Sequence, residues 1–296
     1  MLNYGSLNYD YVYHVDHIVK PGETLHTIEL KEYLGGKGLN QSIALARAGV
    51  PVIHVGHVGP DGGGALDLCK KEGIDASRVD TVNVQTGHAI IQIDKAGENS
   101  IVVFAGANGC NTQEKVHRTL DILQKGDILL LQNEINLLED IVSLARAKGI
   151  TMVLNPSPFN EKITGTILSS VDILVFNATE GESITGKKLP MDMIFELKKR
   201  YPQMRGILTQ GKVGVTYFDQ DRILCVNAYQ VKSLDTTAAG DTFAGYFVAG
   251  LYQQLDMKQA LETACAAAAL ATTVAGASPS IPTQAEVQRF RKTYFR

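Results

Sequence analysis

Residues 235–243, which read DTTAAGDTF, combine small side chains with two acids directly before a long apolar segment. A helix is predicted to begin inside this run, and the free amide groups of a helix N-terminus attract anions. The amides of Ala239, Gly240 and Asp241 would stabilise negative charge that develops during a group transfer. The Asp241 carboxylate would accept the proton of an attacking hydroxyl. The alternative is that Asp241 only caps the helix, which leaves Asp235 and the small residues unexplained.

A glycine-rich loop, residues 35–40 (GGKGLN), precedes a second predicted helix. Glycines let the backbone approach a ligand closely and adopt positive φ angles, and Lys37 and Asn40 add polar groups. The loop is therefore a candidate ligand-binding segment. A tight turn before a helix explains the same residues, and this motif alone does not decide between the two.

Two short polar motifs follow predicted strands. Asn8 and Asp10 are spaced by two, which places both on one side of a strand end, and an amide beside a carboxylate suits the vicinal hydroxyls of a sugar. Asn177 and Glu180 are spaced by three, which places them on one helical face, where they could hold a hydrated Mg²⁺ and phosphate oxygens. The alternatives are a polar turn for the first pair and a helix capping box for the second. On that motif alone, the capping box is favoured.

Short apolar runs alternate with amphipathic stretches through most of the chain, and they position these motifs. The runs are typical of buried strands, and the stretches between them have helical periodicity. Strands are predicted at residues 52–56, 127–131, 151–154, 173–176 and 206–209, and helices at 39–48, 64–72, 112–123, 137–148, 191–200, 239–254, 257–274 and 283–294. This alternation predicts an α/β fold with a mostly parallel sheet and helices on both faces.

Two segments, residues 9–33 and 86–104, break this alternation. The first is rich in Tyr, Val, His and Ile around a Pro21-Gly22 turn, and the second reads as two strands around residues 96–99. Both are predicted to form a small β layer beside the core, and such appendages often act as lids over a site. The alternative is a decorative sheet or a dimer contact, and these roles can coincide.

The composition excludes several classes of protein. The 296 residues are 45% hydrophobic and 20% charged, which is ordinary for a globular protein and excludes wholesale disorder. The 28 Lys and Arg against 31 Asp and Glu give a net charge of −3 with no basic run, which argues against a nucleic-acid or membrane partner. Four scattered cysteines, no secretory signal and no segment suited to spanning a bilayer predict a cytoplasmic protein.

The motifs, taken together and in this order, resemble those of the PfkB carbohydrate kinase family. The resemblance rests on GSLNYD (5–10), GGKGLN (35–40), NATE (177–180) and DTTAAGDTF (235–243), with supporting matches at 106–108, 155–158 and 276–280. It implies a Rossmann-like core with a β lid, and ATP-dependent phosphorylation of a sugar, here the 5-hydroxyl of D-ribose. A single kinase domain, 1–296, is expected, with its core at 1–8, 34–85 and 105–296 and its lid at 9–33 and 86–104.

The resemblance also implies roles for individual residues. The sugar would be bound by Asn8, Asp10, Gly36, Lys37, Gly38, Asn40, Glu134 and Asp241. ATP would be bound by Asn177, Thr209, Gln210, Gly211, Lys212, Val213, Gly214, Gly240, Asp241 and Cys265. Asp241 would be the catalytic base, with Gly240 and Ala239 in the anion hole. Glu180, with Asn177, would manage Mg²⁺, and a K⁺ site would be formed by Asp235, Thr237, Ala271, Val274, Gly276 and Ser280.

Three residues depart from the family pattern. Tyr246 stands where Ala or Gly is usual, Cys265 stands near the adenine where His or Asn is common, and Ala178 replaces a frequent Glu. The exposed apolar residues of the lid favour a homodimer.

Other substrates and a non-catalytic role stay open at this point. Deoxyribose, a nucleoside or a fructose derivative are alternative substrates, and Tyr9, Tyr11 and Tyr13 could stack on a nucleobase. A sugar-binding protein without catalysis is the remote alternative, but it would have no need of both Asp235 and Asp241.

Overall fold

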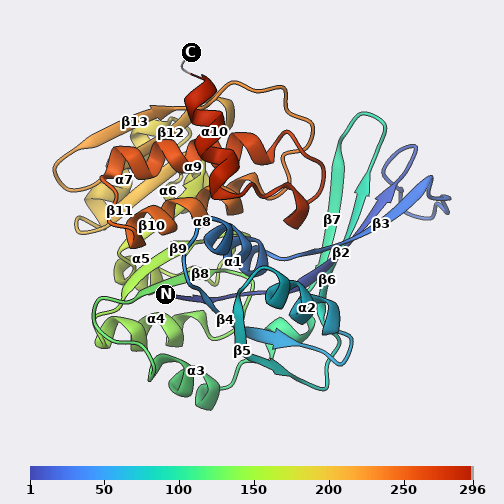
Figure 1. Cartoon of the computed structure of the whole chain (residues 1–296), viewed down its shortest axis with the longest axis horizontal. Coiled ribbons are helices and arrows are strands. Elements are labelled where there is room, and N and C mark those ends of the chain that lie inside the picture. The colour runs from blue at the N-terminus through green and yellow to red at the C-terminus, as the bar shows by residue number, and fades with distance from the viewer. Residues whose placement is uncertain (295–296) are drawn as a thin grey trace.

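The computed structural model describes residues 1–294 and contains two β-sheets of different size (Figure 1). The last two residues of the expected kinase domain lie outside the described residues. The large sheet has nine strands in the order β13-β12-β11-β10-β9-β8-β1-β4-β5. Its strands are β1 (Leu2–Tyr4), β4 (Ile53–Val58), β5 (Asp75–Thr81), β8 (Ile128–Gln132), β9 (Thr151–Asn155), β10 (Ile173–Asn177), β11 (Arg205–Thr209), β12 (Gly214–Phe218) and β13 (Ile223–Asn227).

Most pairs in the large sheet are parallel, and only β11–β12 and β12–β13 are antiparallel. β1 lies inside the sheet between β4 and β8, where Leu2 pairs with Ile53 of β4 and with Leu129 of β8. Because the carboxyl ends of parallel strands share one edge, the segments that follow β1, β8, β10 and β11 meet there. All four of those segments carry predicted site residues.

Helices cover both faces of the large sheet and bury two separate apolar clusters. One cluster involves α1 (Lys37–Arg47), α2 (Gly63–Lys71), α8 (Ala239–Tyr252), α9 (Met257–Ala271) and α10 (Gln284–Tyr294). The other involves α3 (Gln113–Leu120), α4 (Leu138–Ala147), α5 (Gly165–Ser170), α6 (Ala178–Thr185) and α7 (Pro190–Arg200). The central strands are buried on both sides, which is why they read as continuous apolar runs. No helix within residues 1–294 has the length and hydropathy needed to cross a membrane.

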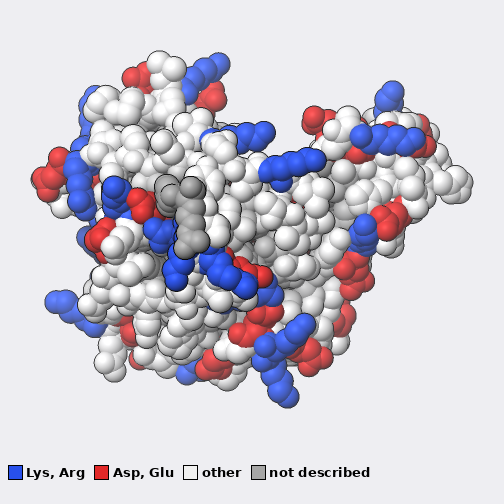
Figure 2. All heavy atoms as spheres, turned by 45° about the horizontal axis from the view of Figure 1, so that its top comes forward, with Lys and Arg blue, Asp and Glu red and all other residues white. Residues whose placement is uncertain are grey.

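The small sheet has four strands in the order β3-β2-β6-β7. Its strands are β2 (Asn8–His14), β3 (Glu29–Gly35), β6 (Gly87–Ile93) and β7 (Asn99–Phe104). It extends from the body as an arm (Figure 1), and Figure 2 shows a hollow between this arm and the body. The two segments that break the strand–helix alternation therefore come together in one layer, with β2 and β6 paired in parallel.

The predicted fold class is confirmed, and most helix and strand boundaries differ from the prediction by one to three residues. Three strands at the two edges of the large sheet, β5, β12 and β13, were not predicted from the sequence, nor was the short helix α5. β5 has the sequence DASRVDT, which lacks both an apolar run and strict alternation. β12 and β13 form an antiparallel hairpin that continues from the predicted nucleotide loop.

Candidate active site

The N-terminus of α8 is shaped by a left-handed residue. Ala238 precedes the helix with φ 58°, and its carbonyl accepts a hydrogen bond from the Thr242 amide at 2.8 Å. The Ala239 amide donates to the Thr236 carbonyl at 3.2 Å. Among the described residues, the amides of Gly240 and Asp241 have no protein acceptor. The predicted anion hole therefore has two available donors rather than three, since Ala239 is used within the turn.

The Asp241 carboxylate is buried and is held by two amide side chains from α1. Asn40 Nδ2 donates to Oδ2 at 3.1 Å, and Gln41 Nε2 donates to Oδ1 at 2.9 Å. Helices α1 and α8 approach closely at Gly245, where a Cβ would lie 2.4 Å from the Ala44 Cβ. This packing brings the carboxylate against the helix that follows the GGKG loop.

Asn8 and Glu134 both lie against the GGKG loop, since a Cβ at Gly36 would fall 3.0 Å from the Asn8 amide nitrogen and Glu134 binds the Lys37 amide. Glu134 Oε2 accepts hydrogen bonds from the Lys37 amide at 2.9 Å and from the Ser6 hydroxyl. Asn8 Oδ1 accepts from Asn108 Nδ2 at 2.7 Å, so the Asn8 amide group keeps its two N–H donors for another partner. Ser6 and Asn108 were not predicted as site residues, although the sequence motifs that surround them were.

Like charges and burial shift the protonation of this cluster. Burial raises the pKa of Asp10 to about 7, aided by the carboxylates of Glu134 and Asp241 and opposed by Lys37. Burial also raises the pKa of Glu134, against the opposing effect of Lys37. Burial alone would lower the pKa of Lys37, but the carboxylates of Asp241, Glu134, Glu180 and Asp10 together raise it. The Lys37 ammonium therefore lies among several carboxyl groups. A cluster of charged side chains of this kind is suited to ligands with many hydroxyls and to phosphates.

Space for the reaction lies directly in front of the α8 N-terminus. A cavity of about 200 Å³ is lined by Lys37, Asn155, Ser157, Val175, Phe176, Asn177, Glu180, Thr209, Thr236, Ala238, Gly240 and Asp241. A Cβ added at Gly240 would meet no atom within 4 Å, so the backbone here is open toward a ligand. The cavity joins the proposed base to residues predicted to manage phosphates.

Asn177 and Glu180 form the capping box of α6, as the alternative interpretation of their spacing predicted. Asn177 Oδ1 accepts from the Glu180 amide at 2.9 Å, and Glu180 Oε2 accepts from the Asn177 amide at 2.9 Å. Glu180 Oε1 accepts from the Ser157 hydroxyl. Both residues also line the cavity, so capping and ligand contact do not exclude each other.

A second cavity, of about 350 Å³, adjoins the first and shares Thr209, Thr236 and Gly240 with it. Of the residues predicted to bind ATP, it is lined by Thr209, Gly211, Lys212, Gly214, Gly240 and Cys265. Asn177 and Asp241 line the first cavity, and two predicted residues, Gln210 and Val213, line neither. The Gln210 side chain instead accepts a hydrogen bond from Thr216 at 2.9 Å, and Val213 faces a different hollow.

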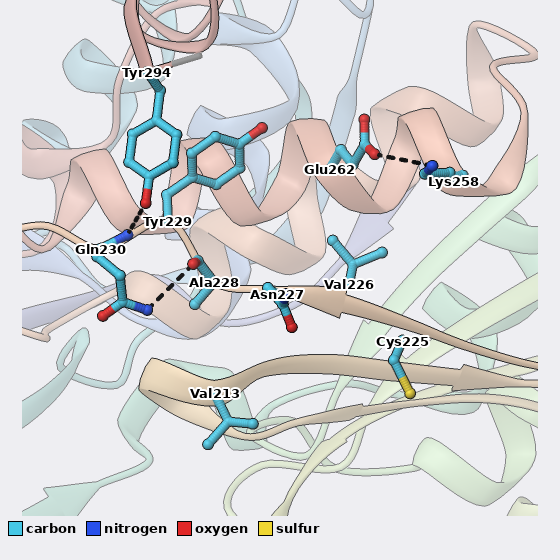
Figure 3. A pocket seen from close by; sticks show the side chains of 10 residues that line it. All are labelled: Val213, Cys225, Val226, Asn227, Ala228, Tyr229, Gln230, Lys258, Glu262 and Tyr294. Carbon is cyan, nitrogen blue, oxygen red and sulfur yellow. Dashed lines mark hydrogen bonds and ion pairs between the residues drawn. The ribbon is translucent and has the colours of Figure 1, made fainter. Parts of the chain in front are cut away.

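A larger cavity, about 600 Å³, is also lined by residues 228–230 and holds none of the proposed catalytic groups (Figure 3). Val213, Cys225, Lys258 and Glu262 are among its lining residues, and the last two form an ion pair at 3.9 Å. Volume alone is therefore a poor guide to the site in this molecule.

Asp235 links the turn before α8 to the loop after α9. Its Oδ1 accepts from the Thr237 amide at 2.8 Å and hydroxyl at 2.6 Å, and its Oδ2 accepts from the Gly276 amide at 2.8 Å. The predicted cation ligands at 235, 237 and 276 are thus adjacent. Ala271 ends α9, and the hydroxyl of the buried Ser280 donates to the Ala277 carbonyl at 2.8 Å. Helix α9 ends at Ala271 rather than at residue 274, so residues 272–274 belong to the loop that follows it.

The residues that depart from the family pattern do not obstruct the site. The Tyr246 hydroxyl donates to the Pro282 carbonyl at 2.7 Å, so this side chain points toward the C-terminal segment. Ala178 is the first residue of α6, and Cys265 lines the larger of the two joined cavities.

Tyr9, Tyr11 and Tyr13 alternate with Asn8 and Asp10 along β2, which places them on the opposite face of the small sheet. The Tyr9 ring stacks on that of Tyr11 at 6.3 Å, and Tyr11 contacts His88 on the same face. The tyrosines that could stack on a nucleobase therefore lie on the face opposite Asn8 and Asp10.

Comparison with known proteins identifies the family. Residues 1–284 match the pfkB family of carbohydrate kinases. The chain belongs to this family. Within the pfkB family, it is 36% identical over 295 residues to a ribokinase of Haemophilus influenzae, and the match covers 97% of this chain and 96% of the relative.

Solved structures of pfkB-family relatives have the same fold. A ribokinase from Thermotoga maritima superimposes with a TM-score of 0.89 at 32% identity, covering 98% of both chains. An Arabidopsis thaliana ribokinase complexed with ribose and ATP superimposes with a TM-score of 0.88 at 27% identity, also covering 98% of both chains.

Proposed function

We propose that this protein transfers the γ-phosphoryl group of ATP to the 5-hydroxyl of D-ribose. The observation that carries the proposal is the buried Asp241 carboxylate beside two unpartnered amides at the N-terminus of α8. These groups face a cavity that is also lined by Lys37 of the GGKG loop and by Thr209 at the start of the nucleotide loop. The ribokinase relatives, and above all the likeness to the complex with ribose and ATP, support ribose as the acceptor.

The chemistry follows from these groups. Asp241 takes the proton of the 5-hydroxyl as its oxygen forms a bond to the γ-phosphorus, and the bond from that phosphorus to the β-phosphate oxygen breaks, so that ADP leaves. The amides of Gly240 and Asp241 stabilise the charge on the transferring group. Asn8 and Asp10 orient the sugar through its other hydroxyls, which keeps the 5-hydroxyl at the base.

Mg²⁺ fits the region of Asn177 and Glu180 as a hydrated ion. Within residues 1–294, no three His, Cys, Asp or Glu side chains gather closely enough to hold a metal. Both Glu180 oxygens already accept protein hydrogen bonds. Asn177 and Glu180 would therefore hold the ion through its water. When bound, Mg²⁺ would neutralise phosphate charge.

K⁺ fits the junction between the turn at Asp235 and the loop at Gly276. The end of α9 supplies backbone carbonyls there, and a carboxylate with carbonyl oxygens suits a monovalent cation. The ion would hold the turn that carries the two free amides. Asp235 already bonds the amides of both segments, which is the competing explanation in which no ion is needed.

The small sheet is proposed to act as the lid and as the contact between two copies in a homodimer. Its outer strand β7 exposes Ile101, Val102, Val103 and Phe104, and a continuous apolar strand of this kind marks an interaction surface.

Figure 2 shows basic and acidic side chains interspersed on the face it displays, in keeping with a small-molecule substrate rather than a nucleic acid. The four free cysteines support a reducing, cytoplasmic setting.

A coupled assay of ADP release tests the proposal. We expect the highest kcat/KM with ribose, ahead of deoxyribose, fructose, adenosine and inosine. The analogue 5-deoxyribose is the matched control, because it keeps the hydroxyls that Asn8 and Asp10 would bind but lacks the acceptor. ADP release from 5-deoxyribose at the rate seen with ribose, or a preference for a nucleoside, would overturn the assignment.

A further inference from the structure

A chain of buried amide side chains runs from strands β1 and β8 of the large sheet to Asp241. Gln41 donates a hydrogen bond to Asp241, and its Oε1 accepts one from Gln132 Nε2 at 2.7 Å. The same Gln132 nitrogen donates to Asn3 Oδ1 at 2.9 Å. Asn3 comes from β1, Gln132 from the end of β8 and Gln41 from α1, and all three are fully buried. We call Asn3, Gln132 and Gln41 the amide relay.

The hydrogen bonds of the amide relay have one possible direction. An ionised carboxylate only accepts, so Gln41 must turn its NH₂ group toward Asp241 and its oxygen toward Gln132. Gln132 must then present its NH₂ group to both Gln41 and Asn3. Its own Oε1 is left buried without a partner in the described structure. An unpaired buried carbonyl is costly, and Gln132 keeps it because both neighbouring oxygens require a donor.

The far end of the relay fixes the same direction. Asn3 Nδ2 donates to the Gly38 carbonyl at 2.7 Å and to Ser42 Oγ at 2.8 Å. Ser42 Oγ in turn lies 2.8 Å from His54 Nδ1, a hydrogen bond in which either atom can donate. Burial lowers the pKa of His54 to about 4, so the ring is neutral and Nδ1 can accept. The Gly38 carbonyl, which can only accept, therefore fixes the orientation of the Asn3 amide.

We propose that Gln41 is a positioning residue for the phosphoryl transfer, and that Gln132 and Asn3 hold its amide in the orientation that donates to Asp241. This inference rests on the proposed function, in which Asp241 is the base. Asn40 and Gln41 each hold one carboxylate oxygen, and two anchors fix the rotation of the carboxylate about its bond to Cβ. A base held in this way meets the 5-hydroxyl without reorientation, which is how positioning contributes to rate.

The relay supplies donors without adding charge to a site that is already acidic. The charged groups facing Asp241 are Lys37 from α1, Asp10 from β2 and Glu134 after β8. A cation in place of Gln41 would make the carboxylate a weaker base, and an anion would compete with it for a proton. A neutral amide with a fixed direction avoids both effects.

Replacing Gln41 by Met, which has a similar shape and no N–H donor, tests the direct contact. We expect kcat to fall roughly 10- to 100-fold, the loss typical of one hydrogen bond to a charged group, with the KM values for ribose and ATP changed less than about threefold. Because the ionised carboxylate loses a donor, the acid limb of the kcat–pH profile should move to higher pH.

Gln132→Met tests the relay itself, because Gln132 does not contact Asp241. We expect roughly a 3- to 10-fold loss of kcat and a shift of the acid limb in the same direction. Asn111→Leu is the matched control. Asn111 is a buried amide that accepts from Tyr4 at 2.6 Å outside the relay, and its loss should lower the melting temperature and leave the pH profile unchanged.

Asp241→Asn, measured in parallel, separates this inference from the proposed function. If Asp241→Asn keeps its turnover, the assignment of the base is wrong and the relay has no catalytic role. If Asp241→Asn is inactive while Gln41→Met and Gln132→Met keep the wild-type kcat and acid limb, only the relay inference is overturned. Gln41→Glu keeps the shape of Gln41 and serves if a methionine variant does not fold. Two facing carboxylates compete for one proton, so its acid limb should also move to higher pH.

Discussion

Asp10 illustrates how neighbouring residues change the chemistry of a single carboxyl group. It lies on the face of β2 that carries Asn8, and Gly35 on the adjacent strand leaves room for it, since a Cβ there would fall 2.1 Å from Asp10 Oδ2. Burial and two nearby acids raise its pKa to about 7. Its protonation therefore changes across the physiological pH range.

This shift predicts a pH-dependent affinity for ribose. Because the pKa of Asp10 is raised to about 7, the neutral form dominates below that pH and the carboxylate above it. The carboxylate is the better acceptor for sugar hydroxyls, so the KM for ribose should fall as the pH rises from about 6 to about 8. The KM for ATP should change little. Steady-state kinetics of the wild type and of Asp10→Asn, which does not titrate, check this. An equal slope in both would contradict the assignment.

At the residue scale, the sequence predicted the groups that belong to recognisable motifs and missed those defined only by contact. Asn8, Asp10, Lys37, Asn40 and Asp241 stand in short motifs at strand and helix ends, where polar side chains need an explanation. Gln41 directly follows the GGKGLN motif, and Gln132 ends the apolar strand β8. Gln41 contacts Asp241 across 200 positions of sequence, and no local pattern encodes such a contact.

At the level of single elements, a substitution at the N-terminus of α8 should affect the stability and the activity of the protein in different ways. A Cβ at Gly240 would meet nothing within 4 Å and would enter the proposed phosphate space. Gly240→Ala should therefore keep or raise stability, by up to about 1 kcal/mol, while kcat/KM for ATP falls. Thermal unfolding and kinetics measure the two effects. The matched control is Gly63→Ala at the start of α2, where a Cβ is equally free, and it should change stability alone. Unchanged kinetics in Gly240→Ala would place the phosphate elsewhere.

The connection between the turn before α8 and the loop after α9 predicts activation by K⁺. A bound ion would hold the turn that presents the Gly240 and Asp241 amides, and such donors are effective only when they are fixed beforehand. Titration with KCl at constant ionic strength, balanced by a bulky organic cation, should raise kcat, and Na⁺ should raise it less. Flat kinetics would show that the hydrogen bonds of Asp235 are sufficient to hold the turn.

Elements were predictable where burial left a clear pattern. The inner strands of the large sheet are apolar on both faces, and most helices between them have one apolar side, so these were predicted. The helix α5 was not, since its six residues are too few to show a clear periodicity. β5 lies at a sheet edge, where half-exposed residues need no apolar run. β12 begins at Gly214 with φ 122°, and the turn before it reads as a ligand loop rather than as the start of a hairpin.

At the scale of the whole molecule, the small sheet presents apolar residues that a single copy leaves in solvent. Val102 on β7 is 66% exposed and pairs with Ile90, which is also exposed. We expect a dimer at micromolar concentration in sedimentation, and Val102→Asp should shift it to monomer because the contact would bury a charge. Leu189→Asp, on the body, is the matched control at 65% exposure and should leave the dimer intact. A monomeric wild type would contradict the dimer and leave the lid role open.

If Asp241 is the base of a ribose kinase, a single turnover in Asp241→Asn must be slow. The variant would be mixed with saturating ribose and radiolabelled ATP, after calorimetry has shown that it still binds ribose. We predict that transfer of label to the sugar slows by about 10²- to 10⁴-fold, with ribose affinity and melting temperature close to those of the wild type. Transfer at close to the wild-type rate would show that Asp241 serves only as a structural residue of α8, and would contradict the account.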